Sequence, residues 1–83
     1  MGLNGKFVLR DIWIAAYLIA YGFPSPELVP VQDRPGIWEF HFEDTSELRR
    51  CYSDFRHGDD LVAAGIYRDA LRGLKKKIVD ATN

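Results

Sequence analysis

The clearest hydrophobic pattern in the chain is an alternation over residues 37–43. Successive side chains of a strand point to opposite faces, so the alternation predicts a half-buried strand with three aromatic rings on its inner face: Trp38, Phe40 and Phe42. Residues 28–32 also favour an extended chain, but Pro30 cannot donate to a ladder, which restricts that strand to an edge. With turn residues at 33–36, the two strands form a predicted β-hairpin with a wet outer face.

Residues 12–21 carry no charge and predict a helix that is apolar on nearly every side. Asp11 offers a side-chain oxygen to the first amides of this helix, and Gly22 suits the left-handed position after its last turn. A short extended segment at residues 6–10 precedes it. Such a helix has to be covered all round, by the rest of the chain or by a second copy of the protein.

A second helix is predicted to follow Asp44, which acts as the N-cap, with Glu47 three residues later completing a capping box. Its apolar stripe has the spacing i, i+3, i+4 and i+7, at Leu48, Cys51, Tyr52 and Phe55. Gly58 places its end near residue 56 or 57.

The last helix is capped by Asp59 or Asp60, or else the chain stays extended until about Ala64. Its apolar spacing continues to about Val79, after which the terminus is expected to fray. The order is helix, antiparallel β-hairpin, helix and helix, with an additional N-terminal strand beside the hairpin. This order predicts one α+β domain over residues 1–83, with helices packed on a small sheet.

Composition narrows the classes of function. With 83 residues, 47% of them hydrophobic, the chain can bury one core without disulfides or metal. The chain has eleven basic and twelve acidic residues, so its overall charge does not attract it to nucleic acid or to an anionic membrane. The longest uncharged stretch, residues 12–26, has too few helix-compatible residues to cross a bilayer. The single cysteine, Cys51, excludes an internal disulfide, and no signal peptide is recognisable, so we expect a cytoplasmic protein.

Two polar clusters are candidate sites of chemistry. Glu39, His41 and Glu43 lie about 7 Å apart along one strand face, too far to grip one ion together, and predict a solvated face. His57 stands before two aspartates and could position a catalytic imidazole, although helix capping explains these residues more simply. Cys51 lies on an apolar stripe and is expected to be inert. The sequence predicts no enzyme, no metal site and no cofactor.

The most distinctive charge pattern in the sequence is a basic stripe on the last helix. With about 100° per residue, four cations fall within an arc of about 100°: Arg68, Arg72, Lys75 and Lys76. Such a stripe can lie along the phosphates of nucleic acid, and Arg49 with Arg50 on the preceding helix could extend it. The alternative is a solvated face whose cations suit the C-terminal end of a helix.

Trp13, Tyr17 and Tyr21 form an aromatic ridge on the first helix, spaced i, i+4 and i+8. The ridge either packs in the core or binds another protein, including a second copy of this chain in a homodimer. In a monomer, residues 7–9 would fold over it. Base stacking on these rings would need basic neighbours, which the first helix lacks.

Several segments together resemble a family of small uncharacterised domains found in bacteria and their viruses. They are Asp11, Ala15, Ala16, Leu18, Gly22, Phe23, residues 38–44, Tyr52 and residues 67–75. The similarity covers almost the whole chain and lies in the order and spacing of ordinary helix and strand patterns. It implies a compact stand-alone domain of a kind carried by mobile elements, and no functional residue.

The sequence therefore favours a non-catalytic small accessory binding module that acts through protein–protein contacts. The alternative is a nucleic-acid-binding domain that uses the basic stripe. Neither interpretation requires a membrane.

Overall fold

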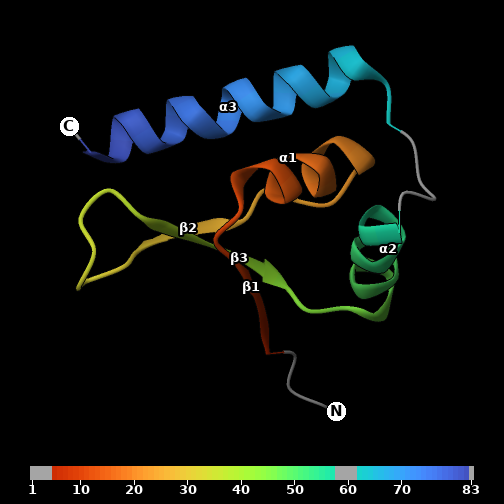
Figure 1. The fold of residues 1–83 in the computed structure, drawn as a ribbon, viewed down its shortest axis with the longest axis horizontal. Coiled ribbons are helices and arrows are strands. Elements are labelled where there is room, and N and C mark those ends of the chain that lie inside the picture. The colour runs from red at the N-terminus through yellow and green to blue at the C-terminus, as the bar shows by residue number, and fades with distance from the viewer. Residues whose placement is uncertain (1–4, 58–61, 83) are drawn as a thin grey trace.

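The computed structural model describes residues 5–57 and 62–82 and has the α+β class that the sequence predicts (Figure 1). Within these residues, three strands form one antiparallel sheet and three helices pack around it. In chain order the elements are β1 (Lys6–Leu9), α1 (Ile12–Tyr21), β2 (Glu27–Pro30), β3 (Trp38–Glu43), α2 (Ser46–His57) and α3 (Ala64–Thr82).

The sheet has the order β1-β3-β2, so the strand with the clearest alternation lies in the centre. Phe40 on β3 stands opposite Leu9 on β1 and Leu28 on β2. Pro30, opposite Trp38, lies on an edge strand, where a residue without an amide hydrogen is tolerated. The additional N-terminal strand and the edge position of β2 are both confirmed.

Helix α1 begins and ends where its flanking residues predict. Asp11 Oδ1 accepts a hydrogen bond of 2.9 Å from the amide of Trp13. At the other end Gly22 adopts a φ of +128°, and the amide of Phe23 donates to the carbonyl of Leu18 at 3.1 Å. A side chain would be strained at this φ, so the closure of the helix depends on glycine.

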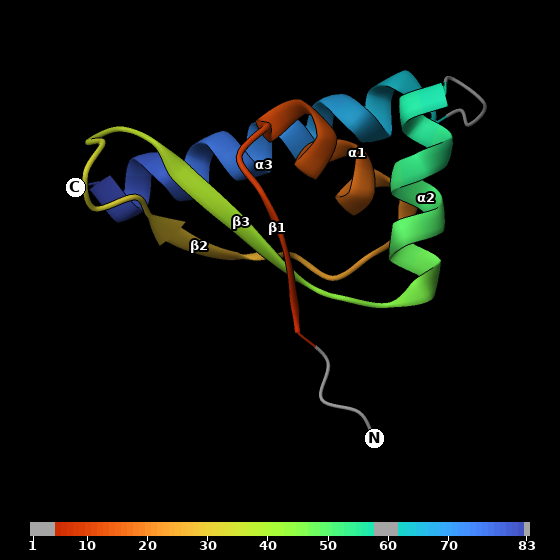
Figure 2. The same ribbon diagram turned by 60° about the horizontal axis from the view of Figure 1, so that its bottom comes forward.

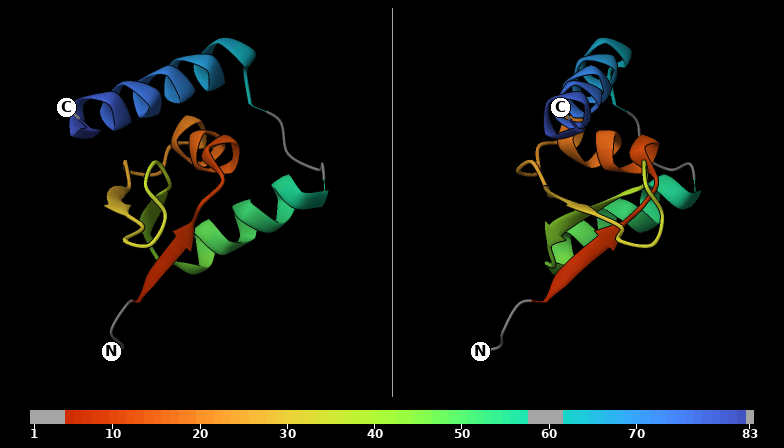
Figure 3. Two further views of the ribbon diagram at one scale, coloured as in Figure 1. Left: turned by 60° about the vertical axis from the view of Figure 1, so that its left-hand side comes forward. Right: turned by 90° about the vertical axis from the view of Figure 1, so that its left-hand side faces the viewer.

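Helix α1 also occupies the middle of the molecule, with α3 on one side and the sheet and α2 on the other (Figures 2 and 3). Its residues 15–18 are all buried. The core continues through Phe40 and Phe42 of the sheet, Leu48 of α2 and Leu74 of α3. The rest of the same chain therefore covers most of this apolar helix.

The predicted capping box at the start of α2 is wrong by one residue. The helix begins at Ser46, so Thr45 is its N-cap, and Thr45 Oγ1 accepts a hydrogen bond of 3.1 Å from the amide of Leu48. Asp44 lies one residue too early to reach these amides, and its carboxylate binds Arg49 instead.

Helix α3 has the later of its two predicted starts, at Ala64, and the alternative caps Asp59 and Asp60 lie outside the described residues. The predicted helix end near Val79 is three residues too early, because the helix continues to Thr82, whose hydroxyl donates to a backbone carbonyl one turn earlier. No helix within residues 5–57 and 62–82 is both long enough and apolar enough to span a bilayer.

Candidate functional site

The aromatic ridge of α1 is divided by the tertiary structure. Trp13 and Tyr21 are 53% and 52% exposed, whereas Tyr17 is only 3% exposed. The ring of Tyr17 lies 4.5 Å from the ring of Phe55 on α2, measured between centroids. Phe55 thus covers the middle of the ridge, and residues 7–9 pair in the sheet as part of β1. The prediction of one continuous interface does not hold for Tyr17, and Trp13 and Tyr21 become two separate exposed positions.

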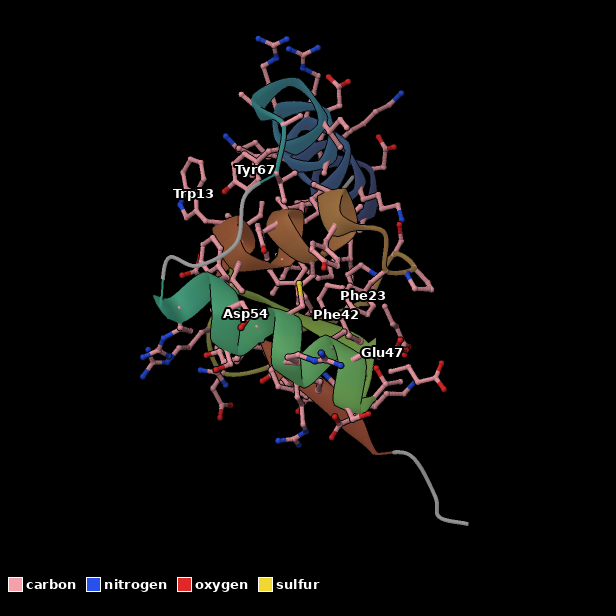
Figure 4. All side chains as sticks on the ribbon, turned by 90° about the vertical axis from the view of Figure 1, so that its right-hand side faces the viewer. Trp13, Phe23, Phe42, Glu47, Asp54 and Tyr67 are labelled. Atoms are coloured by element: carbon pink, nitrogen blue, oxygen red, sulfur yellow. The ribbon has the colours of Figure 1, made fainter. Side chains whose placement is uncertain are left out.

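At the start of α1, two contacts join Trp13 to α3, and Figure 4 shows Trp13 and Tyr67 side by side. The hydroxyl of Tyr67 donates to the carbonyl of Trp13 at 3.0 Å. The ammonium of Lys75 lies 5.6 Å from the centroid of the indole ring, within the range of cation–π attraction. Partial burial, and to a smaller extent the charge of Asp11, raises the pKa of Tyr67 above its ordinary value of 10.0. Helix α3 supplies the basic neighbour that α1 lacks.

The four members of the basic stripe, Arg68, Arg72, Lys75 and Lys76, are all exposed on α3. At about 100° per residue, Arg68, Arg72 and Lys75 lie on one flank of the helix, and Lys76 lies further round toward its outer side. None of the four makes an ion pair with another residue in the described part of the chain. Their charges are therefore available to an anion from outside.

Arg49 and Arg50 do not extend this stripe, because α1 separates α2 from α3 (Figure 3). Nε and Nη2 of Arg49 donate to the two carboxylate oxygens of Asp44, both at 2.7 Å. These hydrogen bonds lower the pKa of Asp44 and raise that of Arg49. The Arg49 guanidinium also lies 5.5 Å from the centroid of the Phe7 ring.

Arg50 is one of the residues that line a groove at the opposite end of α1 from Trp13. The groove has a volume of about 420 Å³ and runs between the end of α1 and one face of α2. Its lining residues are Tyr21, Gly22, Phe23, Glu47, Arg50, Cys51 and Asp54. Figure 4 looks onto this side of the molecule, with Glu47 and Asp54 along α2 and Phe23 behind it.

The two walls of the groove differ in chemistry. On one wall the rings of Tyr21 and Phe23 stack, with centroids 5.9 Å apart and planes 16° apart. The other wall is polar, and buried Cys51 belongs to it as the one α2 residue of the lining without a charge. Sequence reasoning missed this groove because its walls are 24 or more residues apart. The one signal in the sequence was the helical spacing of the charged residues 47, 50 and 54 around Cys51, which places them on one side of α2.

On the outer face of the sheet, Glu39 links two partners. Its Oε2 accepts a hydrogen bond of 3.0 Å from Arg10 Nη2, and its Oε1 lies 3.0 Å from His41 Nε2. These contacts, that of His41 first, lower the pKa of Glu39. Glu43, the third residue predicted for this face, stands opposite Lys6.

Within the described residues, no three histidine, cysteine, aspartate or glutamate side chains lie close enough to hold a metal ion. The second polar cluster of the sequence cannot be placed in the same way. The side chain of His57 and both following aspartates fall outside the described part of the chain.

Comparison with models of known protein families identifies a family for this chain. A family model described as a domain of unknown function (DUF5659) matches residues 4–80. The chain belongs to this family. The matched segment contains every element from β1 to most of α3, so the match extends over nearly the whole fold. No curated protein and no solved structure matches the chain.

Proposed function

We propose that this domain is a non-catalytic accessory module that docks on another protein through the groove at the end of α1. The observation that carries the proposal is the position of Tyr21, which exposes half of its side chain beside an open groove. A tyrosine ring offers a large, rigid, apolar surface with a polar tip, and such residues anchor protein interfaces. Because the chain has one cysteine and needs no disulfide, we place this role in a reducing compartment, the cytoplasm.

The chemistry of the groove suggests the kind of segment that binds there. An apolar side chain of the partner packs on the stacked rings of Tyr21 and Phe23. Arg50 has Glu47 one turn before it and Asp54 one turn after it, yet it forms an ion pair with neither. A carboxylate next to the apolar side chain therefore finds an available guanidinium. A volume of about 420 Å³ accommodates such an anchor.

The test uses affinity capture from the natural host with two matched variants. Tyr21→Ala removes the anchor from the groove, and Trp13→Ala removes an equally exposed aromatic ring from the far end of the same helix. We expect a captured protein to be retained by the wild type and by Trp13→Ala, and lost with Tyr21→Ala. Titration of the purified partner should then show at least a tenfold weaker Kd for Tyr21→Ala, which corresponds to about 1.4 kcal/mol.

A second copy of this chain is one partner that the same experiment identifies. Light scattering of the purified protein over a range of micromolar concentrations measures this directly, because a dimer has twice the 9.5 kDa mass of the chain. A dimer that Tyr21→Ala dissociates supports docking through the groove. A partner that is retained equally by both variants contradicts it.

A further inference from the structure

Basic and acidic residues are unevenly distributed along this chain, although its net charge is only −1. Helix α3 contains five basic and two acidic residues, so the rest of the chain, with six basic and ten acidic residues, is negative. Asp69 precedes Arg72 by three residues and Asp80 follows Lys76 by four, spacings at which helix ion pairs form. Neither pair forms within the described residues. The exposed side of α3 is therefore a cationic surface whose charges no acidic side chain in residues 5–57 and 62–82 neutralises by an ion pair.

An exposed indole lies at the border of this surface. Trp13 exposes 53% of its side chain next to Lys75, and the hydrogen bond from Tyr67 holds its backbone against α3. Tryptophan is costly to leave half in water, since burial of an aromatic ring is favourable. Its exposure here, beside a lysine that makes no ion pair in the described residues, combines two features that lie far apart in the sequence.

A single-stranded nucleic acid has phosphates that suit the cations of α3 and unpaired bases that suit the exposed indole of Trp13. Proteins that bind single strands place cations along the backbone and stack bases on aromatic side chains. An acidic protein segment without aromatic residues would satisfy the cations but would have no flat π-face for the indole. In a duplex the bases are already stacked on each other and cannot lie on Trp13.

We propose that the Trp13–α3 face, formed by Trp13, Arg68, Arg72 and Lys75, binds single-stranded nucleic acid. A base stacks on the indole of Trp13, and the adjoining phosphates lie along Arg68, Arg72 and Lys75, with Lys76 adding charge at the outer edge. This face lies at the opposite end of α1 from the groove with Tyr21, so the proposal is independent of protein docking at that groove.

The experiment measures fluorescence anisotropy of a fluorescein-labelled oligothymidylate of about twelve nucleotides, and of a duplex of equal length, at about 50 and 200 mM salt. The single strand is expected to bind more tightly than the duplex, and its affinity is expected to fall as salt rises. Trp13→Ala should weaken single-strand binding about 5-fold to 100-fold, the range found for removal of one stacking platform. Tyr21→Ala, an equally exposed aromatic at the other end of α1, is the control and should leave binding unchanged.

Charge is tested with a second matched pair. Arg72→Glu changes a cation on the Trp13–α3 face, and Lys77→Glu makes the same change on the opposite flank of α3. We expect a loss of more than about tenfold for Arg72→Glu and less than about threefold for Lys77→Glu. Circular dichroism establishes that each variant is folded.

Three results would overturn the proposal. The first is no binding of the oligothymidylate at about 20 mM salt. The second is equal loss in Arg72→Glu and Lys77→Glu, which would indicate unspecific attraction. The third is binding of polyglutamate as tight as that of the single strand, because it would assign the Trp13–α3 face to an acidic protein.

Discussion

The two ends of α1 carry aromatic side chains of nearly equal exposure in different surroundings. Trp13, 53% exposed at the first turn, lies beside Lys75 and is tied to Tyr67. Tyr21, 52% exposed at the last turn, stacks on Phe23 beside a groove with charges of both signs. One end thus presents an aromatic ring with cations, and the other presents an aromatic ring with an apolar neighbour.

This difference teaches that spacing along a helix does not define a surface. The ring midway between them, Tyr17, has the same spacing and is buried against Phe55. The flanking elements decide the outcome, because α2 covers the middle of the ridge and leaves both ends open. The two ends therefore have different surroundings, although their rings are almost equally exposed.

The largest expected effect lies in the middle of the helix. Tyr17→Ala should lower the free energy of unfolding by about 3–5 kcal/mol, since it leaves a cavity in the core. Trp13→Ala and Tyr21→Ala should each cost about 1 kcal/mol or less, because half of each side chain is already in water. Denaturation in urea, followed by circular dichroism, measures all three. If Tyr17→Ala does not fold, Tyr17→Leu should fold with a smaller loss. Equal losses at the three positions would contradict the division of the ridge.

The two ends should also differ in how their backbones are stabilised. Gly22→Ala forces a side chain into a φ of +128° and should cost about 1–3 kcal/mol. No atom lies within 4 Å of the added Cβ, so the cost comes from the backbone alone. Asp11→Ala removes the N-cap and should cost about 1 kcal/mol. The same urea titration tests both, and a neutral Gly22→Ala would show that the end of α1 tolerates another closure.

A smaller effect is expected from the hydrogen bond at the Trp13 end. Tyr67→Phe deletes the donor to the Trp13 carbonyl and should cost about 0.5–1.5 kcal/mol. The pKa of Tyr67 is raised above its ordinary value of 10.0, so the neutral phenol is favoured in the folded state. The wild type should therefore keep this stabilisation below pH 10 and lose it as pH rises further. Thermal unfolding at rising pH should show a loss for the wild type that Tyr67→Phe lacks, and identical profiles would contradict the raised pKa.

The smallest effect concerns the outer face of the sheet, at the ion pair between Glu39 and Arg10. The pKa of Glu39 lies below its ordinary value of 4.5, so its ionised form is favoured by folding. This contribution is present above pH 4.5 and is lost as pH falls through the lowered pKa. Glu39→Gln should therefore show a shallower acid dependence of stability than the wild type. Because the pair with Arg10 is exposed to solvent, added salt should weaken the difference, and a steeper acid dependence in Glu39→Gln would contradict the direction of the shift.

Local sequence was sufficient to predict the features that depend only on neighbouring residues. The boundaries of α1 follow from Asp11 and Gly22, and the inner face of β3 follows from alternation. The edge position of β2 follows from Pro30, because a missing amide hydrogen restricts where a strand can lie. The cap of α2 shows how narrow such signals are, since Asp44 and Thr45 both suit the role and geometry selected the second.

The candidate sites depended on distant segments and were predicted only in part. The stripe on α3 was found from spacing, and the structure shows it exposed and without ion pairs in the described residues. The link from Lys75 to Trp13 joins residues 62 positions apart, and no periodicity reports such a contact. The assignment of Arg49 to this stripe failed for the same reason, because α1 separates the two helices.

By itself the sequence determined the α+β class, the helix α1 with its caps, the strand β3, and the residue types available on each face. These follow from backbone sterics and from the periods of side chains, which are local properties. Only the tertiary structure decided which aromatic ring of α1 is covered, which cations lie beside an exposed ring, and that Tyr21 borders a groove. These outcomes depend on how α2 and α3 pack on α1, and packing is set by the complementarity of whole faces rather than by any one segment.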